Sequence, residues 1–352
     1  MIPFSPGKIN LFLHGKIFIF FLPLSWYNST YIFQKGDFEM AVHKNGIIVI
    51  GAVFVDIKGF PDDVYIPDGR NAGRVEYVHG GVSRNVVEDI ANIELRPTFL
   101  GIVDDSALGQ DVMHKLGNHK VNTSYMRTVK GGMGTWLAVF DHNGDVAGSV
   151  SQRPDLSPIL DILEENGDEI FAEADSVVVE VDVDKEIIKK VIQLCEKYDK
   201  KLYGVVSNMS IAMNRRDFLQ QFDCFICNQQ EAGMFFSEDY SEKNPEELQT
   251  ILAKSLSLAN VPSMIVTMGG AGSVYADNQG HSGFCPARKV HVKDTTGAGD
   301  SFCAGVVSGL TYGCSLAKAA EIGTRLAASV ITSSENVCPR FLPAELGIEV
   351  NA

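Results

Sequence analysis

The stretch Asp294-Thr295-Thr296-Gly297-Ala298-Gly299-Asp300 determines how the rest of the chain is interpreted. It follows an alternating run over 289–293, which we expect to be a strand, and precedes an apolar helical run over 301–310. Gly297 and Gly299 lack a Cβ, so the backbone can turn tightly and bring several N–H groups to one point. These groups lie at the start of the predicted helix, where the macrodipole favours an anion. The stretch therefore predicts an anion-binding turn.

Asp300 is an unexpected neighbour for such a turn, because its carboxylate repels the anion that the amides attract. The combination is explained if the carboxylate takes a proton from an attacking hydroxyl while the amides hold a phosphoryl group. This layout suits phosphoryl transfer to an alcohol. The structural alternative is an acid that only interacts with the helix dipole.

The composition limits the partners of the protein. Among 352 residues, 44 are acidic and 30 basic, which gives a formal charge of -14. This charge argues against binding to nucleic acid polymers or an anionic membrane. A site for a polyanion such as ATP must then be built locally. Seven cysteines at irregular spacing do not indicate a disulfide framework, and the Cys224-x-x-Cys227 pair fits core packing better than a metal site.

Residues 1–39 differ from the remainder of the chain. Their apolar run over 17–24 is too short to span a bilayer, and no small-x-small cleavage site follows it. We expect 1–39 to be an extension of doubtful origin that is not part of the fold, with Met40 as the natural start. The remainder, 40–352, is expected to be a single cytoplasmic domain.

Strands and helices alternate along this domain, which predicts an α/β fold with a doubly wound, mostly parallel sheet. The β-branched run over 46–56 predicts a first strand, buried on both faces and ending at Asp56. Segments 57–79 and 131–152, the latter with a hairpin around 141–145, predict a small antiparallel β lid. Further strands are expected over 98–103, 176–181, 201–206, 222–227 and 264–267, and helices over 107–116, 185–198, 245–258 and 315–330.

Several polar or glycine-rich loops follow predicted strands. Asn228-x-x-Glu231 follows the strand over 222–227, and a glycine-rich loop over 267–272 follows the next one. Gly80-Gly81 precedes a helix that contains Asn85. Because the carboxyl ends of parallel strands meet at one sheet edge, we expect these loops to lie near 294–300. Taken singly, each has a bland alternative: a helix cap for Asn228 and ordinary turns for the glycines.

Other nucleotide-binding classes are disfavoured. No G-x-x-x-x-G-K-[ST] stretch occurs, and neither does the H-R-D or D-F-G set of protein kinases. Gly297 and Gly299 begin a G-x-G-x-x-G pattern, but Phe302 replaces its third glycine. This departure disfavours a nicotinamide oxidoreductase.

With these motifs in order, the sequence resembles the PfkB-type carbohydrate kinases, the ribokinase-like group. The stretch 294–300 resembles the C-terminal signature of that family, and Gly80-Gly81 with Asn85 its sugar-binding signature. Asn228-x-x-Glu231 resembles its magnesium motif, and 267–272 its nucleotide loop. The resemblance covers residues 45–345 and implies a three-layer ribokinase-like fold.

The resemblance also implies a role for each motif residue. Asp300 would be the general base, and an anion hole for the γ-phosphoryl group would consist of the amides of Gly297, Ala298, Gly299 and Asp300. Substrate hydroxyls would contact Asp56, Gly80, Gly81, Asn85 and Asp300. The ATP site would be lined by Asn228, Thr267, Gly269, Gly272 and Thr295. Mg²⁺ would be held largely through water by Asn228 and Glu231, and K⁺ by carbonyls of Asp294, Thr296 and the 331–339 loop.

The acceptor is expected to be a small sugar or nucleoside. Residues 81–88 resemble the corresponding run of bacterial pseudouridine kinases, which favours conversion of pseudouridine to pseudouridine 5'-phosphate. A ribokinase, or a kinase of another furanose or nucleoside, is the alternative. A non-catalytic sugar- or nucleotide-binding protein of the same fold is disfavoured by the intact 294–300 stretch. The lid hairpin around 141–145 could also pair with the lid of a second copy, giving a homodimer.

Overall fold

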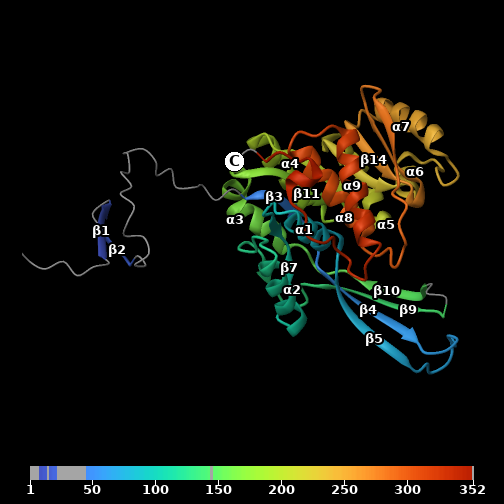
Figure 1. Ribbon diagram of the computed structural model, residues 1–352, viewed down its shortest axis with the longest axis horizontal. Helices are drawn as coiled ribbons and strands as arrows, with labels where there is room; N and C mark the ends of the chain where they lie inside the picture. The colour runs from blue at the N-terminus through green and yellow to red at the C-terminus, as the bar shows by residue number, and fades with distance from the viewer. Residues whose placement is uncertain (1–7, 14–15, 22–44, 143–145, 351–352) are drawn as a thin grey trace, which may run out of the picture. The chain divides into compact units, whose positions relative to one another are not determined.

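The computed structural model describes residues 8–13, 16–21, 45–142 and 146–350 (Figure 1). The chain forms two compact units, Met1–Val42 and His43–Ala352. In the first unit, β1 (Lys8–Leu13) and β2 (Lys16–Phe21) form an antiparallel hairpin. Met40 lies outside the described residues, so the proposed natural start stays a prediction. None of the helices in the described part is long and apolar enough to cross a membrane.

An eight-stranded sheet forms the centre of the second unit. Its strand order is β16-β15-β14-β13-β12-β11-β3-β6, in which the six strands from β14 to β6 run parallel and β15 and β16 are antiparallel at one edge. This confirms the predicted mostly parallel α/β sheet. The strands are β3 (Gly46–Ile50), β6 (Thr98–Leu100), β11 (Ala174–Glu180), β12 (Lys201–Val205), β13 (Cys224–Asn228), β14 (Ser263–Thr267), β15 (Gly272–Asp277) and β16 (Ser282–Pro286).

Helices cover both faces of this sheet, because its strands carry apolar side chains on both. In β3, Ile48 and Ile50 belong to one core cluster, whereas Ile47 and Val49 belong to the other. The first cluster is completed by α3 (Pro158–Ala172), α4 (Lys185–Tyr198), α6 (Gln229–Phe236) and α7 (Pro245–Ala259). The second is completed by α1 (Val82–Asn92), α2 (Ala107–Asn118), α8 (Ala298–Thr311) and α9 (Leu316–Val330). Shorter elements are β7 (Ile102–Val103), β8 (Arg127–Thr128), α5 (Met209–Ala212), η2 (Met213–Gln221), η3 (Gly269–Ala271) and α10 (Pro343–Leu346).

A separate four-stranded sheet forms the lid, and Figure 1 shows it projecting from the main sheet. Its strand order is β10-β9-β4-β5, with antiparallel outer pairs and a parallel pair in the centre. The lid strands are β4 (Phe54–Pro61), β5 (Gly73–Gly80), β9 (Gly134–Phe140) and β10 (Val146–Gln152). The predicted β lid is therefore confirmed, although residues 143–145 of its hairpin turn lie outside the described part.

Three expected strands differ in the structure. The run over 46–56 is two strands, because the chain leaves the main sheet at residue 51 and enters the lid at Phe54. Asp56 thus lies within a lid strand and does not end a strand of the main sheet. The run over 98–103 is split into β6 and β7 at Gly101. The run over 289–293 forms no strand; its apolar side chains Val290 and Val292 are exposed and lack a partner strand.

Candidate active site

The 294–300 stretch is a turn that leads directly into α8. The Thr296 amide donates to Asp294 Oδ1 at 2.8 Å, and the Ala298 amide donates to the Thr295 carbonyl at 3.2 Å. Gly299 and Asp300 lie in the first turn of α8, whose amides have no preceding helical carbonyl to bind. Of the four predicted anion-hole amides, that of Ala298 is thus engaged within the turn, while those of Gly299 and Asp300 suit an anion.

Gly297 caps α8 and cannot be replaced without disturbing its surroundings. Its φ of +80° is in the left-handed region, and a Cβ at this position would lie 2.0 Å from the Asn336 carbonyl oxygen. Asn336 in turn donates through Nδ2 to the His79 carbonyl at 2.7 Å and to Asn85 Oδ1 at 3.2 Å. The glycine therefore allows the turn to pack on a segment that also contacts α1 and the end of β5.

Asp300 is held by Asn85, as Asn85 Nδ2 donates to Asp300 Oδ2 at 2.7 Å. The orientation of the Asn85 amide is set by Arg84, whose Nη1 donates to Asn85 Oδ1 at 2.8 Å. Burial raises the pKa of Asp300 to about 6, with the Asn85 hydrogen bond lowering it and the charge of Asp56 raising it. A carboxylate with a pKa of about 6 is suited to accept a proton near neutral pH.

The predicted substrate residues of the lid lie close to this base. A Cβ on Gly80 would lie 2.6 Å from Asp56 Oδ1, so this glycine leaves room for the Asp56 carboxylate. Gly81 has a φ of +98°, and a Cβ there would lie 2.8 Å from the Ala52 carbonyl oxygen. Burial raises the pKa of Asp56, while Lys58 and Arg84 lower it. The structure thus brings Asp56, Asn85 and Asp300 close together. Glycine is needed at positions 80 and 81 because the junction between the lid and the main sheet leaves no room for a side chain.

Sequence reasoning missed a set of buried polar residues in α1 that support the site. Asp89 accepts hydrogen bonds from Ser301 Oγ at 2.7 Å and from the Cys338 amide at 2.5 Å. Burial raises the pKa of Asp89 to about 7. Arg84 forms a buried ion pair with Glu88, one helical turn later. The sequence did contain a signal, because charged residues recur in a helix that begins at a glycine pair. Charges in a helix that is buried on all sides must be paired.

The predicted nucleotide and metal motifs follow the ends of β13 and β14, as expected. Asn228 and Glu231 form a reciprocal capping box: Asn228 Oδ1 accepts from the Glu231 amide, and Glu231 Oε2 accepts from the Asn228 amide, both at 2.8 Å. In the next loop, a Cβ on Gly269 would meet open space, whereas one on Gly272 would lie 2.2 Å from the Cys285 carbonyl oxygen. Gly269 therefore leaves the loop surface open, and Gly272 is required for packing against β16.

The metal motif and the base lie near the same helix turn. Burial raises the pKa of Cys303 in α8, and the Asp300 and Glu231 carboxylates both add to that rise. Burial also raises the pKa of Glu231, and the charge of Asp182 adds to it. Within the part of the chain that the structure describes, no group of three or more His, Cys, Asp or Glu side chains is arranged to hold a metal ion directly.

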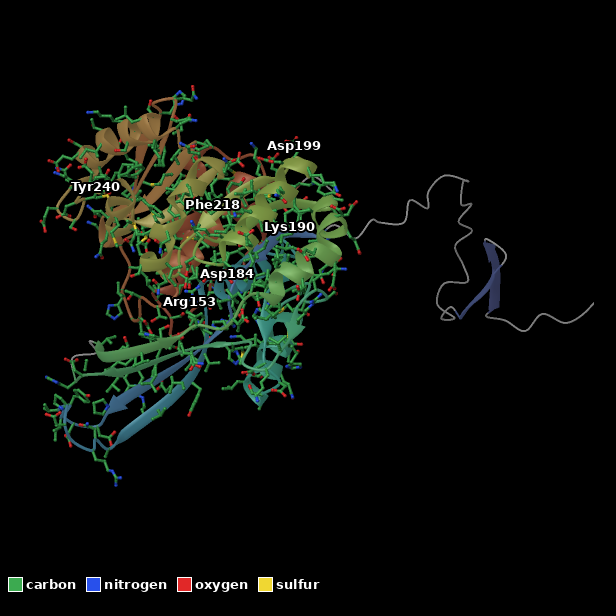
Figure 2. The ribbon with its side chains drawn as sticks, turned by 180° about the vertical axis from the view of Figure 1, so that it is seen from behind. Arg153, Asp184, Lys190, Asp199, Phe218 and Tyr240 are labelled. Atoms are coloured by element: carbon green, nitrogen blue, oxygen red, sulfur yellow. The ribbon has the colours of Figure 1, made fainter. Side chains whose placement is uncertain are left out.

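An arginine joins the lid to the main sheet. Arg153 follows β10 and pairs through Nη1 with Asp182 Oδ2 at 2.6 Å and through Nη2 with Glu180 Oε1 at 3.5 Å. Figure 2 shows Arg153 at the boundary between the lid strands and the rest of the unit. Glu180 also accepts from Ser83 Oγ at 2.8 Å, which links the end of β11 to the start of α1. The two ends of the lid are thus anchored close to the site.

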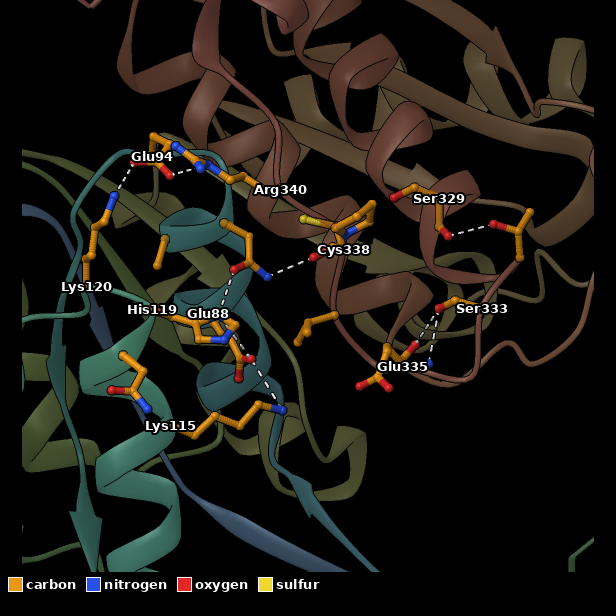
Figure 3. A pocket seen from close by; sticks show the side chains of 16 residues that line it. Glu88, Glu94, Lys115, His119, Lys120, Ser329, Ser333, Glu335, Cys338 and Arg340 are labelled. Carbon is orange, nitrogen blue, oxygen red and sulfur yellow. Dashed lines mark hydrogen bonds and ion pairs between the residues drawn. The ribbon is translucent and has the colours of Figure 1, made fainter.

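A cavity of about 690 Å³ lies beside the same loop that supports Gly297 (Figure 3). Its walls include Glu88, Lys115 and His119 on one side and Ser329, Ser333 and Glu335 on the other. It does not contain the base, the glycines or the metal motif described above. Val337 and Cys338, the residues after Asn336, line it, so the loop separates this cavity from the Asn85–Asp300 hydrogen bond.

The chain is similar to known carbohydrate and nucleoside kinases. A model of the pfkB family of carbohydrate kinases matches residues 44–338. The chain is 34% identical over 303 residues to guanosine-inosine kinase of Exiguobacterium acetylicum, covering 85% of this chain and 99% of that protein. It is 22% identical over 267 residues to pseudouridine kinase of Escherichia coli (strain K12), covering 75% and 83% of the two chains. The structure of Arabidopsis thaliana ribokinase complexed with ribose and ATP matches with a TM-score of 0.73 at 19% identity, covering 84% and 96%.

Proposed function

Because the chain belongs to the PfkB family of carbohydrate kinases, we propose that it transfers the γ-phosphoryl group of ATP to the 5'-hydroxyl of a ribonucleoside, with guanosine and inosine favoured. Phosphorylation of a sugar or nucleoside hydroxyl is the chemistry of the family. The observation that carries the proposal is the Asn85–Asp300 hydrogen bond of 2.7 Å beside Asp56, at the first turn of α8.

In the proposed reaction, Asp300 accepts the proton of the acceptor hydroxyl. The hydroxyl oxygen forms a bond to the γ-phosphorus, the bond from that phosphorus to the β,γ-bridging oxygen breaks, and ADP leaves. The amides of Gly299 and Asp300 stabilise the negative charge on the phosphoryl oxygens. Electrostatic stabilisation of this kind is usually the largest contribution to such catalysis. Asp56 and Asn85 orient the acceptor by accepting and donating hydrogen bonds to its ribose hydroxyls.

Cations complete the proposed site. Asn228 and Glu231 would hold Mg²⁺ through water, with Glu231 using the carboxylate oxygen that the capping box leaves free; the metal would neutralise phosphate charge. K⁺ would lie on carbonyls of Asp294, Thr296 and the 331–339 loop. Two contacts support this cation site: the Lys293 amide donates to the Ile331 carbonyl at 2.7 Å, and Gly297 packs on the Asn336 carbonyl.

The inner face of the lid supports a nucleoside as the acceptor. In the lid register, Trp136 lies directly opposite Asp56, so both side chains project from the same face. Phe60 and Phe140 continue that face, with stacked rings 4.8 Å apart, and Trp136 meets Phe140 edge-on at 6.4 Å. Because Arg74 lies over the Phe60 ring at 4.2 Å, a nucleobase whose ribose reaches Asp56 would stack on Trp136 or on the free face of Phe140. The higher identity to guanosine-inosine kinase favours a purine over pseudouridine.

A screen of ATP consumption tests this assignment. The purified protein would be assayed with guanosine, inosine, adenosine, uridine, pseudouridine, ribose and fructose, and the Asp300→Asn variant would supply the background. We expect the highest kcat/KM for guanosine or inosine. A preference for pseudouridine would restore the expectation from residues 81–88, and a preference for a free sugar would rule out the stacking surface as a specificity element.

We also propose that the outer face of the lid mediates a homodimer. Tyr77, Leu137 and Val150 lie side by side across the lid through Ile57, and their exposed fractions are 61%, 43% and 68%. Contiguous apolar surface of this kind is typical of an interface. Sedimentation should show a dimer that the double substitution Tyr77→Glu with Leu137→Glu converts to a monomer. A wild-type protein that is monomeric at tens of micromolar would contradict the proposal.

A further inference from the structure

Lys58 is a largely buried, charged residue of the lid that has no part in the function proposed above. It lies in β4, two residues after Asp56, and only 8% of it is exposed. Among the residues that the structure describes, its ammonium group forms neither an ion pair nor a hydrogen bond. The ammonium nitrogen is not among the fully buried side-chain atoms that lack a hydrogen-bond partner, so the apolar stem is buried while the charged end stays accessible. Such a group can bind an anionic ligand without moving its stem.

The lid register places Lys58 on the face that is directed at the site. Lys58 pairs with Ala138 and Asp56 pairs with Trp136, so all four side chains project from one face of the lid sheet. Ala138 is 1% exposed, which shows that this face is covered at that point. The aromatic surface formed by Phe60, Trp136 and Phe140 belongs to the same face.

The charge of Lys58 acts on carboxylates of both the lid and the catalytic turn. Burial raises the pKa of Asp56, and Lys58 is the charge that lowers it most. Partial burial also acts to raise the pKa of Asp294, but hydrogen bonds from Thr296 and the charge of Lys58 keep it below its ordinary value. Lys58 therefore influences a carboxylate on the lid and one at the start of the anion-binding turn, without contacting either.

We propose that Lys58 binds the transferring phosphoryl group from the lid side, opposite the amides of Gly299 and Asp300. This proposal rests on the function proposed above. A phosphoryl oxygen would provide the anionic partner that the ammonium group lacks, and lysine binds phosphate as a compact point charge. Lys58 acts only by charge and hydrogen bonding. The proton of the acceptor still passes to Asp300, and the bond to the β,γ-bridging oxygen still breaks to release ADP.

The arrangement also couples acceptor binding to catalysis. Asp56 and Lys58 are on one strand, so an acceptor that draws Asp56 onto its ribose hydroxyls brings Lys58 towards the phosphoryl group. Charge that is positioned for the transition state raises kcat more than it lowers KM. This distinguishes Lys58 from a residue that only binds the acceptor.

The test replaces Lys58 by methionine, which keeps the length of the buried stem and removes the charge. We expect kcat to fall by ~10²–10³, as for the loss of one transition-state donor, with an acceptor KM changed by less than about threefold. Lys58→Arg should recover part of the loss, because it restores the charge with a different geometry. The matched control is Lys130→Met at an exposed lysine, which should behave as wild type.

A second measurement does not depend on the acceptor. The complex of ADP, Mg²⁺ and fluoroaluminate mimics the transferring phosphoryl group, and Lys58→Met should weaken it by ~10²-fold while ADP alone binds as before. If Lys58→Met keeps kcat and the fluoroaluminate complex, while Asp300→Asn abolishes turnover, the role of Lys58 is wrong and the proposed function stands. If the wild-type protein neither transfers phosphate nor forms the complex, the proposed function fails and the role of Lys58 fails with it.

Discussion

Asp300 and Asp56 are two acids directed at the same space, but they are held by different kinds of structure. Asp300 belongs to a contiguous turn at the start of α8, which is fixed by Asn85, by the Asp89–Ser301 hydrogen bond and by packing of Gly297 on Asn336. Asp56 belongs to a lid strand that pairs only with other lid strands. In the proposed function, the chemical step therefore depends on a local motif of the main unit, whereas acceptor choice depends on a separate sheet.

The largest expected effect comes from removing the base in this local motif. Asp300→Asn keeps the size and the hydrogen bond to Asn85, but it cannot accept a proton, so kcat should fall by at least ~10²-fold while ATP still binds. The matched control is Asp161→Asn, another acid in the first turn of a helix, which should retain activity. Steady-state kinetics and calorimetric ATP binding measure both. Unchanged turnover in Asp300→Asn would remove the proposed base.

The same variant should be more stable than wild type at alkaline pH. Because the folded-state pKa of Asp300 is raised to about 6, its favourable contribution is complete below the unfolded pKa of 3.8 and is lost as pH rises through about 6. The charged carboxylate therefore destabilises the fold at pH 8. Asp300→Asn should raise Tm at pH 8 and give little gain near pH 4, which separates loss of the base from loss of the fold.

A smaller effect is expected from disturbing the packing that fixes the motif. Gly297→Ala places a Cβ 2.0 Å from the Asn336 oxygen, so the 334–338 segment must move and release its hydrogen bonds to His79 and Asn85. We expect kcat to fall by ~10-fold or more, with a loss of stability of ~1–3 kcal/mol from the left-handed backbone. Thermal unfolding and kinetics measure the two effects.

Gly313→Ala is the control for Gly297→Ala. Gly313 ends α8 with a φ of +83°, but nothing lies within 4 Å of a Cβ added there. Gly313→Ala should lower the stability of the protein by a similar amount, because the alanine must adopt a left-handed backbone conformation, and it should leave kcat unchanged. Equal kcat losses at both positions would show that the Asn336 contact does not support catalysis.

The difference between the two regions also explains what the sequence could predict. The turn at 294–300 and the loops after β13 and β14 each consist of residues that are consecutive in the sequence. Their glycines and polar residues therefore indicate a site directly. The run over 46–56 was misinterpreted because residues 51–53, between β3 and the lid, are as buried as the strands on either side. Apolar periodicity cannot show where a buried chain leaves one sheet for another. Asp89 and Asn336 were missed because their partners lie far away in the chain.

The smallest expected effect, and the finest test of how the two regions interact, is a shift in pH dependence. Asp300 must be ionised to act, so kcat/KM should rise with pH through an apparent pKa of about 6. The Asn85 hydrogen bond lowers this pKa and the charge of Asp56 raises it. Asn85→Leu should therefore move the acidic limb to higher pH, and Asp56→Asn should move it to lower pH, each by up to about one unit.

The opposite directions of these shifts separate an effect on the base from general damage to the site, which would lower the plateau without moving the limb. His79 also lies near the site, and its pKa is lowered by burial and by Arg84, so it could contribute to the same profile. His79→Gln supplies the control and should leave the limb in place. If Asp56→Asn leaves the limb unmoved while its acceptor KM rises, the lid carboxylate binds the acceptor without acting on the base. The lid would then be electrostatically independent of α8.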